Sequence, residues 1–220
     1  MGRFWLRPCT MKKILNIHSH LNLEQRDDTI YSTIYPKLPK ATIKYGSIGI
    51  HPWYIPPLEE INWENFVEEA SKNKIIVIGE CGLDTFSEIP LDTQIKVFQK
   101  QIEVSEMLKK PLLIHMVRTT DELLAIRNQL NPTQPWIIHG FRGKPQLAQQ
   151  YYRHEMYLSI GSKFNTKTVL AIPLNKILLE TDESDETIDS LVDRIAQLKK
   201  ISPQTLIKQI YENTESIFFR

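Results

Sequence analysis

Short apolar runs alternate with longer stretches of helical periodicity along most of the chain, and this alternation limits the possible fold more than any other feature. The runs are apolar almost without interruption, as expected of strands buried on both faces of a parallel sheet. The stretches between them place apolar residues three and four positions apart, which is typical of amphipathic helices. Repeated strand–helix units predict a parallel sheet with crossover helices, and hence an α/β fold.

The expected elements become regular from residue 60 onward. Helices are predicted over residues 61–73, 92–109, 120–129, 145–152, 166–171, 188–200 and 203–213. In the first third, strands are expected over residues 29–35 and 45–51, but only about eight residues precede the first of them after His20, whereas a parallel crossover needs roughly a dozen. We therefore predict a TIM-barrel (β/α) fold of seven or eight strands, distorted or trimmed in its first third, where a helix is missing or replaced by a loop.

Five of the apolar runs end in residue types that bind metal ions. The run ends carry His18 and His20, Glu80, His115, His139, and lastly Glu180 and Asp182. His18 and His20 share one side of a strand, because side chains i and i+2 point the same way. In a parallel barrel the carboxyl ends of the strands meet at one mouth, so these residues are expected to converge there.

Four imidazoles and two carboxylates of this set suit divalent metal ions. We predict that metal is bound by His18, His20, Glu80, His115, His139 and Asp182, with water completing the coordination. Two ions are expected, Mg, Mn or Zn, about 3.5–4 Å apart and bridged by Glu80. Glu80 and Asp182 are the predicted catalytic residues, since Asp182 can both bind metal and accept the proton of an attacking water.

Substrate contacts are expected beside these ligands. Arg118 and Arg142 each lie three residues beyond a ligand histidine, where a guanidinium could hold a phosphate or carboxylate, or instead form a loop salt bridge. His51 is expected to touch substrate or to support a ligand from behind. Weaker candidates are Lys163 and Asn165 for phosphate, and Trp53, Tyr54 and Phe86 for stacking on a base.

Composition excludes several other classes of protein. The chain of 220 residues has 27 Lys and Arg against 26 Asp and Glu, so no overall field favours nucleic acid, and polyanion binding would need a local patch. No apolar stretch approaches the roughly 18–20 residues of a membrane span. Cys9 and Cys81 are far apart and suggest no disulfide framework, which favours a cytoplasmic protein. Residues 1–10 are expected to be a disordered extension and residues 11–220 a single domain, and no protein partner is indicated.

Six blocks between residues 16 and 183 resemble the signature of the TatD family. They are His-Ser-His at residues 18–20, Gly-Ile-His-Pro at 49–52, Gly-Glu-Cys-Gly-Leu-Asp at 79–84, Pro-Leu-Leu-Ile-His at 111–115, His-Gly-Phe-Arg-Gly at 139–143 and Leu-Glu-Thr-Asp at 179–182. The resemblance implies a TIM-barrel metal-dependent hydrolase, with members acting as Mg-dependent deoxyribonucleases. It also implies that one metal is held by His18, His20, Glu80 and Asp182, and the second by Glu80, His115 and His139.

The chain departs from the family pattern at the barrel mouth. The family block usually reads His-Cys-Phe-Ser-Gly, whereas this chain has Gly140 and Arg142. Residues 183–186 read Glu-Ser-Asp-Glu where the family tends to have Ala-Pro, and the segment between His20 and His51 is short. These differences leave the expected metal ligands in place and bear on the substrate.

The leading functional prediction is a phosphodiesterase of the deoxyribonuclease type, in which metal-activated water attacks a phosphodiester of DNA in line. One alternative is hydrolysis of a small ester, amide or phosphate on the same scaffold, which the near-neutral charge and the acidic run after Asp182 favour. A further alternative is a non-catalytic metal-binding barrel, although such a protein would not need a full ligand set together with a base.

Overall fold

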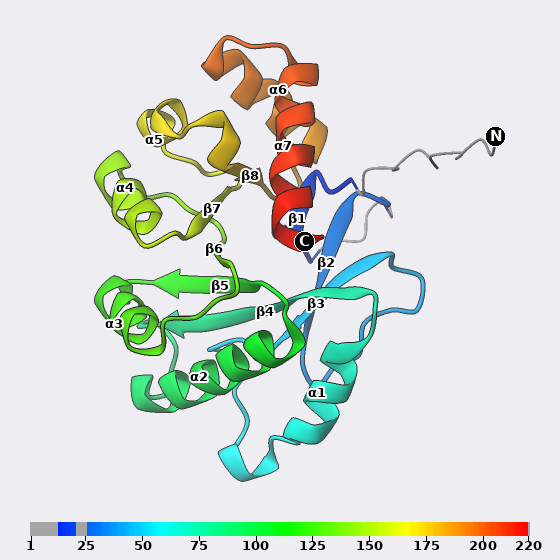
Figure 1. The fold of residues 1–220 in the computed structure, drawn as a ribbon, viewed down its shortest axis with the longest axis vertical. Coiled ribbons are helices and arrows are strands. Elements are labelled where there is room, and N and C mark those ends of the chain that lie inside the picture. The colour runs from blue at the N-terminus through cyan, green and yellow to red at the C-terminus, as the bar shows by residue number, and fades with distance from the viewer. Residues whose placement is uncertain (1–12, 21–25, 220) are drawn as a thin grey trace, which may run out of the picture.

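The computed structural model describes residues 13–20 and 26–219, and these form eight parallel strands with helices between most of them (Figure 1). The strands are β1 (Asn16–Ser19), β2 (Thr29–Ile34), β3 (Tyr45–Gly49), β4 (Ile75–Asp84), β5 (Leu112–Val117), β6 (Trp136–Ile138), β7 (Tyr157–Ile160) and β8 (Ile177–Leu179). Each strand pairs with the next in chain order, and a bridge between Ser19 and Asp182 brings the end of the sheet back to its start. The predicted TIM-barrel class is confirmed. The extension predicted over residues 1–10 lies outside the described residues.

The helices pack around the strands. They are α1 (Trp63–Ser71), α2 (Leu91–Leu108), α3 (Thr120–Leu130), α4 (Pro145–Arg153), α5 (Thr166–Ala171), α6 (Ile188–Lys199) and α7 (Pro203–Phe218), with short 3-10 helices η1 (Leu58–Glu60) and η2 (Leu174–Lys176). In Figure 1, α1 and α2 lie below the strands, α3 to α5 to the left, and α6 and α7 above. The last helix was predicted to end at residue 213 but continues to Phe218, because its final turns are buried against the barrel.

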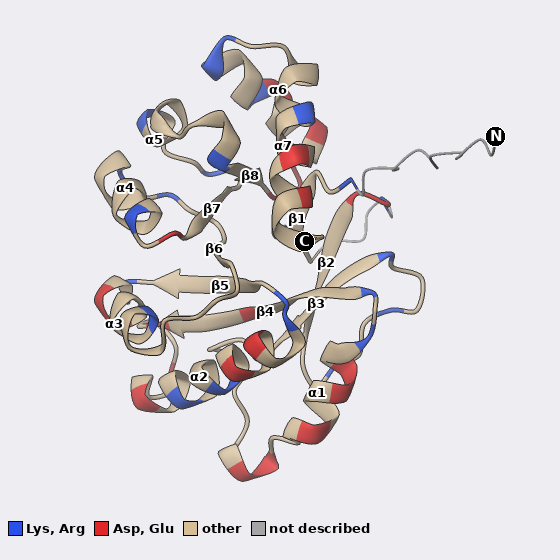
Figure 2. Cartoon of the chain, in the orientation of Figure 1, with Lys and Arg blue, Asp and Glu red and all other residues tan. Residues whose placement is uncertain are grey.

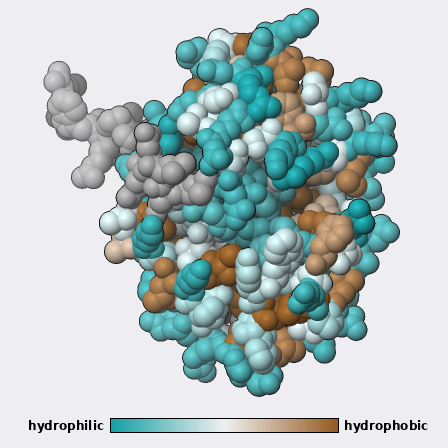
Figure 3. All heavy atoms as spheres, turned by 180° about the vertical axis from the view of Figure 1, so that it is seen from behind, coloured by the Kyte–Doolittle hydropathy of each residue, from teal (hydrophilic) through white to brown (hydrophobic). Residues whose placement is uncertain are grey.

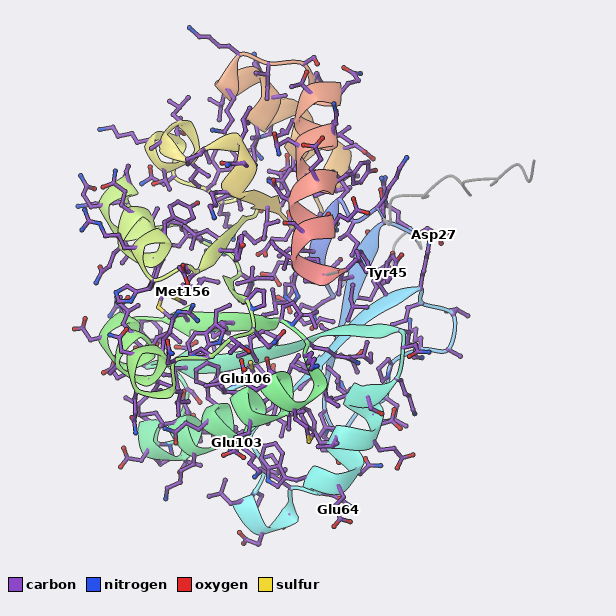
Figure 4. All side chains as sticks on the ribbon, viewed as in Figure 1. Asp27, Tyr45, Glu64, Glu103, Glu106 and Met156 are labelled. Atoms are coloured by element: carbon purple, nitrogen blue, oxygen red, sulfur yellow. The ribbon has the colours of Figure 1, made fainter. Side chains whose placement is uncertain are left out.

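The first third is trimmed as expected. No helix lies along residues 35–44 between β2 and β3, or among the described residues between β1 and β2. The carboxyl end of α7 instead reaches the start of these strands. Thr214 donates a hydrogen bond to the carbonyl oxygen of Ile14, and the ring of Tyr45, which Figure 4 shows beside the end of α7, lies 5.5 Å from that of Phe219.

The apolar core has two layers. The larger layer lies between the sheet and the helices, and the smaller one fills the barrel interior. Interior residues of the smaller layer include Ile17, Val77, Leu113, Ile137 and Leu178. Because side chains alternate along a strand, the residue two positions after each of Leu113 and Ile137 also points inward. This alternation directs the imidazoles of His115 and His139 into the mouth of the barrel.

Charged side chains of both signs are spread over the outer helices (Figure 2). On the opposite face, apolar patches are divided by polar residues (Figure 3). Figure 2 shows no broad region of a single sign among the described residues, in keeping with the net charge of +1. Among the described helices, none combines the length and the apolar character needed to cross a membrane.

Candidate metal centre

Glu80 lies at the centre of the residues predicted to bind metal. Its Oε2 is 3.3 Å from Nε2 of His18 and 3.1 Å from Nε2 of His20. Its Oε1 is 2.8 Å from Nε2 of His139 and 2.9 Å from Nδ1 of His115. The two oxygens of one buried carboxylate therefore face two different pairs of histidines.

Asp182 joins the His18 and His20 side of this cluster. Its Oδ1 lies 3.4 Å from Nε2 of His18 and 3.8 Å from Nε2 of His20. Backbone hydrogen bonds hold it there, since the Asp182 amide donates to the His18 carbonyl and the His20 amide donates to the Asp182 carbonyl. Its side chain is 32% exposed, more than those of the histidines and Glu80, so this side of the cluster is open to solvent. All six predicted ligands thus meet in one pocket.

The environment of His18 fits a bound cation. His18 is fully buried, and neither of its ring nitrogens has a hydrogen-bond partner within the described chain. Burial opposes protonation, but the carboxylates of Asp182 and Glu80 outweigh it and raise the pKa of His18 to about 9. A positive charge is therefore favoured at this point, and the ligand atoms of His18, His20 and Glu80 lie within 4.8 Å of one another. Imidazole and carboxylate donors at such spacing suit a divalent metal ion.

The charge of Glu80 is stabilised in the same way. Burial works against its ionisation, yet the surrounding His139, His115 and His18 lower the pKa of Glu80 well below its ordinary value. The pKa of His139 is raised well above its ordinary value, because Glu80 and Glu180 outweigh its burial. Two carboxylates and several imidazoles in one buried pocket therefore form a site in which a metal ion would take the place of shared protons.

Two acidic residues that the sequence analysis did not assign lie behind the histidines. Asp84 Oδ2 is 2.8 Å from Nε2 of His115, and Glu180 Oε1 is 3.3 Å from Nδ1 of His139. Each carboxylate accepts the proton of the ring nitrogen that faces it, so that the other nitrogen of the ring would be available to a metal ion that replaces the proton shared with Glu80. Glu180 is itself held by the Gly140 amide, which donates to Oε1 at 2.6 Å.

Asp84 is fixed from several directions. The Trp53 indole Nε1 donates to its Oδ2 at 2.7 Å, and the Phe86 amide donates to its Oδ1 at 2.8 Å. Gln94 of α2 binds both the amide and the carbonyl of its backbone. Although burial opposes ionisation, His115 and these donors lower the pKa of Asp84. The carboxylate is therefore charged and rigidly placed behind His115.

His51 contacts Glu80 but is poorly suited to bind metal. Its Nε2 lies 3.2 Å from Glu80 Oε1, and its Nδ1 accepts a hydrogen bond from the Trp53 amide at 3.1 Å. Burial lowers the pKa of His51, which favours the neutral ring. A neutral ring that accepts at Nδ1 carries its proton on Nε2, so that nitrogen donates to Glu80. His51 therefore supports the carboxylate, although His51, Glu80 and His115 together have metal-ligand spacing.

Two glycines let β4 approach β5 closely enough to turn Glu80 inward. A Cβ atom at Gly82 would lie 2.1 Å from the His115 carbonyl oxygen, and one at Gly79 would lie 2.4 Å from that of Leu113. Both glycines have φ near +140°, a region that other residues rarely adopt. The pairing register of the two strands shifts between Ile78 and Cys81, which is where Glu80 enters the pocket.

The predicted substrate contacts lie around the rim. The guanidinium of Arg118 stacks over the ring of Phe86 at 4.7 Å, and Arg142 is exposed beside a cavity that also contains Asp182. Neither arginine forms an ion pair with another described residue. Trp53, Tyr54 and Phe86 are 51%, 57% and 62% exposed. Apolar rings and unpaired cations are thus both available to a substrate at the mouth.

Comparison with known proteins gives a consistent result. Residues 33–219 match the family model described as TatD related DNase. The metal-dependent hydrolase YabD of Bacillus subtilis is 24% identical, over 93% of this chain and 98% of that protein. The 3'-5' RNA nuclease TATDN2 of Homo sapiens is 28% identical, over 70% of this chain and 22% of that protein. Among solved structures, the TatD homolog YjjV of Escherichia coli superposes with a TM-score of 0.74 at 16% identity, over 94% of this chain and 98% of that one.

Proposed function

The chain belongs to the TatD related DNase family, and we propose on this basis that it is a metal-dependent nuclease that hydrolyses phosphodiester bonds of DNA, acting as a single domain over residues 11–220. The observation that carries the proposal is the position of Glu80, whose Oε1 and Oε2 face separate histidine pairs. A carboxylate placed in this way can bridge two ions, and paired ions are suited to in-line displacement at phosphorus.

The proposed site holds two divalent ions, Mg, Mn or Zn. One would be held by His18, His20, Glu80 and Asp182, and the other by Glu80, His115 and His139. When bound, the ions lower the pKa of a water molecule and neutralise negative charge on the phosphate. Asp84 and Glu180 orient the rings of His115 and His139 from behind, so that the nitrogens facing Glu80 would bind a metal ion once it displaces the shared protons.

Asp182 is the proposed proton acceptor. Burial raises its pKa, but the positive charge of His18, whose Nε2 lies 3.4 Å from Oδ1 of Asp182, outweighs burial and holds the pKa of Asp182 below its ordinary value. The carboxylate is therefore ionised at neutral pH. Its partial exposure at the open side of the pocket lets it reach a water that approaches the phosphorus from the solvent.

The rim supports a nucleic-acid substrate. Exposed rings at Trp53, Tyr54 and Phe86 offer surfaces on which unpaired bases can stack, and Arg118 and Arg142 offer positive charge to the backbone. None of these groups is placed to recognise the edges of particular bases. We therefore propose that the protein contacts the sugar–phosphate backbone and the faces of the bases. RNA is the competing polymer, because one relative of this chain is a 3'-5' RNA nuclease.

Cleavage of a labelled single-stranded DNA oligonucleotide tests the proposal. Products are expected with Mg or Mn, and none after chelation or in Asp182→Asn. Asp193→Asn removes an exposed carboxylate of α6 outside the metal centre and serves as the matched control, which is expected to cleave normally. The rate at which an RNA of the same sequence is cleaved shows which of the two polymers is the better substrate. Cleavage that persists in excess chelator, or that is undiminished in Asp182→Asn, would contradict the proposal.

The second candidate is hydrolysis of a small ester, amide or phosphate. It is favoured by Glu183 and Asp185, whose exposed carboxylates follow Asp182 and would repel a polyanion, whereas Glu186 is neutralised by Arg194. Metal-dependent turnover of p-nitrophenyl esters or phosphates, together with failure to cut either polymer, would favour this candidate over the nuclease.

A cytoplasmic location is also proposed. The support is the scarcity of cysteine and the buried, unpaired thiol of Cys81. Cell fractionation should place the protein with cytoplasmic markers, and recovery from the medium or periplasm would refute this.

A further inference from the structure

A second cavity opens beside the candidate metal centre, at the carboxyl ends of β6, β7 and β8. It has a volume of about 250 Å³ and shares Asp182 with the metal centre. Two cations line it, Arg142 from the segment after β6 and Lys163 from the segment after β7. The cavity therefore places two cations beside the position where a phosphodiester would be cut.

The segment that carries Arg142 is anchored by its neighbour. Phe141 is buried, its amide donates to the Ser159 carbonyl at 2.9 Å, and its ring lies 5.9 Å from that of Tyr151. Arg142 follows directly and is exposed. The backbone is thus held in place while the guanidinium remains free to move toward a ligand.

The segment that carries Lys163 is anchored on both sides. Arg194 of α6 donates to the Ser162 carbonyl at 3.3 Å, and its guanidinium lies over the ring of Phe164 at 4.8 Å. Glu186 pairs with the same guanidinium and keeps it in this position. Lys163 lies between these two anchored residues and extends into solvent at the cavity.

Charges in the cavity leave the two cations without a partner. Within the described chain, neither Arg142 nor Lys163 comes within ion-pair distance of a carboxylate. Three carboxylates also line the cavity: Glu180 and Asp182, which belong to the metal centre, and Glu183, which is exposed. Two unpaired cations converging on a preformed cavity are suited to a phosphate, to which an arginine can donate two parallel hydrogen bonds and a lysine can add a point charge.

We propose that this cavity binds the phosphate that neighbours the scissile phosphodiester, through Arg142 and Lys163. The proposal rests on the proposed nuclease function, because the ligand is part of the same substrate. The bound phosphate is either a phosphate monoester at the end of the strand or the next internal phosphodiester.

Binding without cleavage tests the proposal. Fluorescently labelled oligothymidylates with a 5′-phosphate, a 3′-phosphate or only hydroxyl ends are titrated with protein in excess chelator, and anisotropy gives the dissociation constants. If a terminal phosphate is the ligand, one phosphorylated end is expected to bind about tenfold more tightly than the hydroxyl end, the gain of a charge-assisted hydrogen bond. Arg142→Gln and Lys163→Gln should each remove this preference.

If the bound phosphate is an internal phosphodiester, the titrations are expected to give a different result. All three ends then bind alike, but Arg142→Gln weakens binding and lowers the slope of log K against log salt by about 0.7, as expected for one lost phosphate contact to a single strand. Lys167→Gln, an exposed lysine of α5 outside the cavity, is the control for charge alone and should leave end preference unchanged. Circular dichroism melts establish that the variants are folded.

The outcomes separate this inference from the nuclease proposal. If Arg142→Gln and Lys163→Gln match the wild type in affinity, end preference and salt slope, the subsite is refuted even when DNA is cleaved normally. If the phosphate preference or the slope change is found while no polymer is cleaved with Mg or Mn, the subsite stands and the nuclease proposal fails.

Discussion

Asp84 Oδ2 lies 2.8 Å from Nε2 of His115, on the side of the imidazole opposite to the nitrogen that faces Glu80. The same oxygen accepts the indole proton of Trp53, a residue that is half exposed at the rim. Two hydrogen bonds therefore connect a surface aromatic ring to a candidate metal ligand. His115 is held in one tautomer and one orientation by a carboxylate that lies behind its ring.

Asp84→Asn should weaken metal binding at the His115 side of the pocket by about 10–100-fold, because the ring loses its charged partner. Isothermal titration with Mn measures this directly. Asp193→Asn, an exposed acidic residue of α6, is the control and should bind metal as the wild type does. Unchanged affinity in Asp84→Asn would mean that His115 needs no support from behind.

The metal-free protein should lose stability as the pH rises from 6 to 9. The pKa of His18 is raised from 6.5 to about 9, so its contribution is complete below pH 6.5 and is lost as the pH rises through about 9. The contribution of Glu80 to the free energy of unfolding changes with pH in the opposite direction. Because the pKa of Glu80 is lowered, its contribution is complete above about pH 4.5 and does not change between pH 6 and 9. The loss in free energy of unfolding is on the order of 3 kcal/mol for His18. Urea titrations in chelator measure it.

His154→Gln is the control for that pH dependence, because His154 lies away from the pocket on the turn after α4. It should retain the full loss of stability, whereas His18→Gln should lose the share due to His18 and keep the share due to His139, whose pKa is also raised. Saturating metal should reverse the trend, since metal displaces protons from the histidines and binds more tightly as the pH rises. A metal-free stability that is flat or rising between pH 6 and 9 would contradict the assigned charges.

Gly82→Ala should destabilise the barrel by at least about 3 kcal/mol, since the new Cβ atom meets the His115 carbonyl oxygen and φ is +139°. Gly161→Ala adds the same methyl group where the nearest atom is 3.6 Å away, and should cost less than about 1 kcal/mol. Thermal melts of the two variants compare the effects. Equal melting temperatures would show that β4 does not need to approach β5 so closely.

Tyr54→Ala should weaken binding of single-stranded DNA by about tenfold, the value of one base stacked on an aromatic ring. Tyr54 is more exposed than Trp53 and does not bind Asp84, so its loss leaves the hydrogen bonds behind His115 intact. Leu130→Ala, an exposed apolar residue at the far end of α3, is expected to bind normally. Anisotropy in chelator gives both constants, and equal affinities would remove Tyr54 from the substrate surface.

The convergence of the pocket residues could be predicted from the sequence because the strands are regular. His115 and His139 each follow an apolar interior residue by two positions, and a parallel barrel brings all such positions to one mouth. The shortness of the segment between β1 and β2, of which residues 21–25 lie outside the described part, predicted a missing helix there, whereas the absence of a helix along residues 35–44 between β2 and β3 was not predicted. Both the convergence of the ligands and the trimming expected in the first third follow from the lengths and apolar pattern of the strands and from the barrel topology that they imply.

Asp84 and Glu180 were missed for a physical reason. The apolar run of β4 ends at Glu80, whereas the strand continues to Asp84. Because side chains alternate along a strand, Glu80, Gly82 and Asp84 lie on the same face. Glu180 follows the interior Leu178 by two positions and could have been placed inward by the same rule. The tautomer of His51 could not be predicted, because it depends on the amide of Trp53 in a turn whose shape the sequence does not specify.

A manganese-soaked crystal of the protein, measured at the manganese absorption edge, would show whether Glu80 bridges two ions. The anomalous difference map should contain two peaks about 3.5–4 Å apart, one on the side of His18 and His20 and one on the side of His115 and His139. Glu80→Gln should remove or weaken both peaks. A single peak, or two peaks with no contact to the Glu80 carboxylate, would contradict the bridged pair of ions on which the proposed chemistry depends.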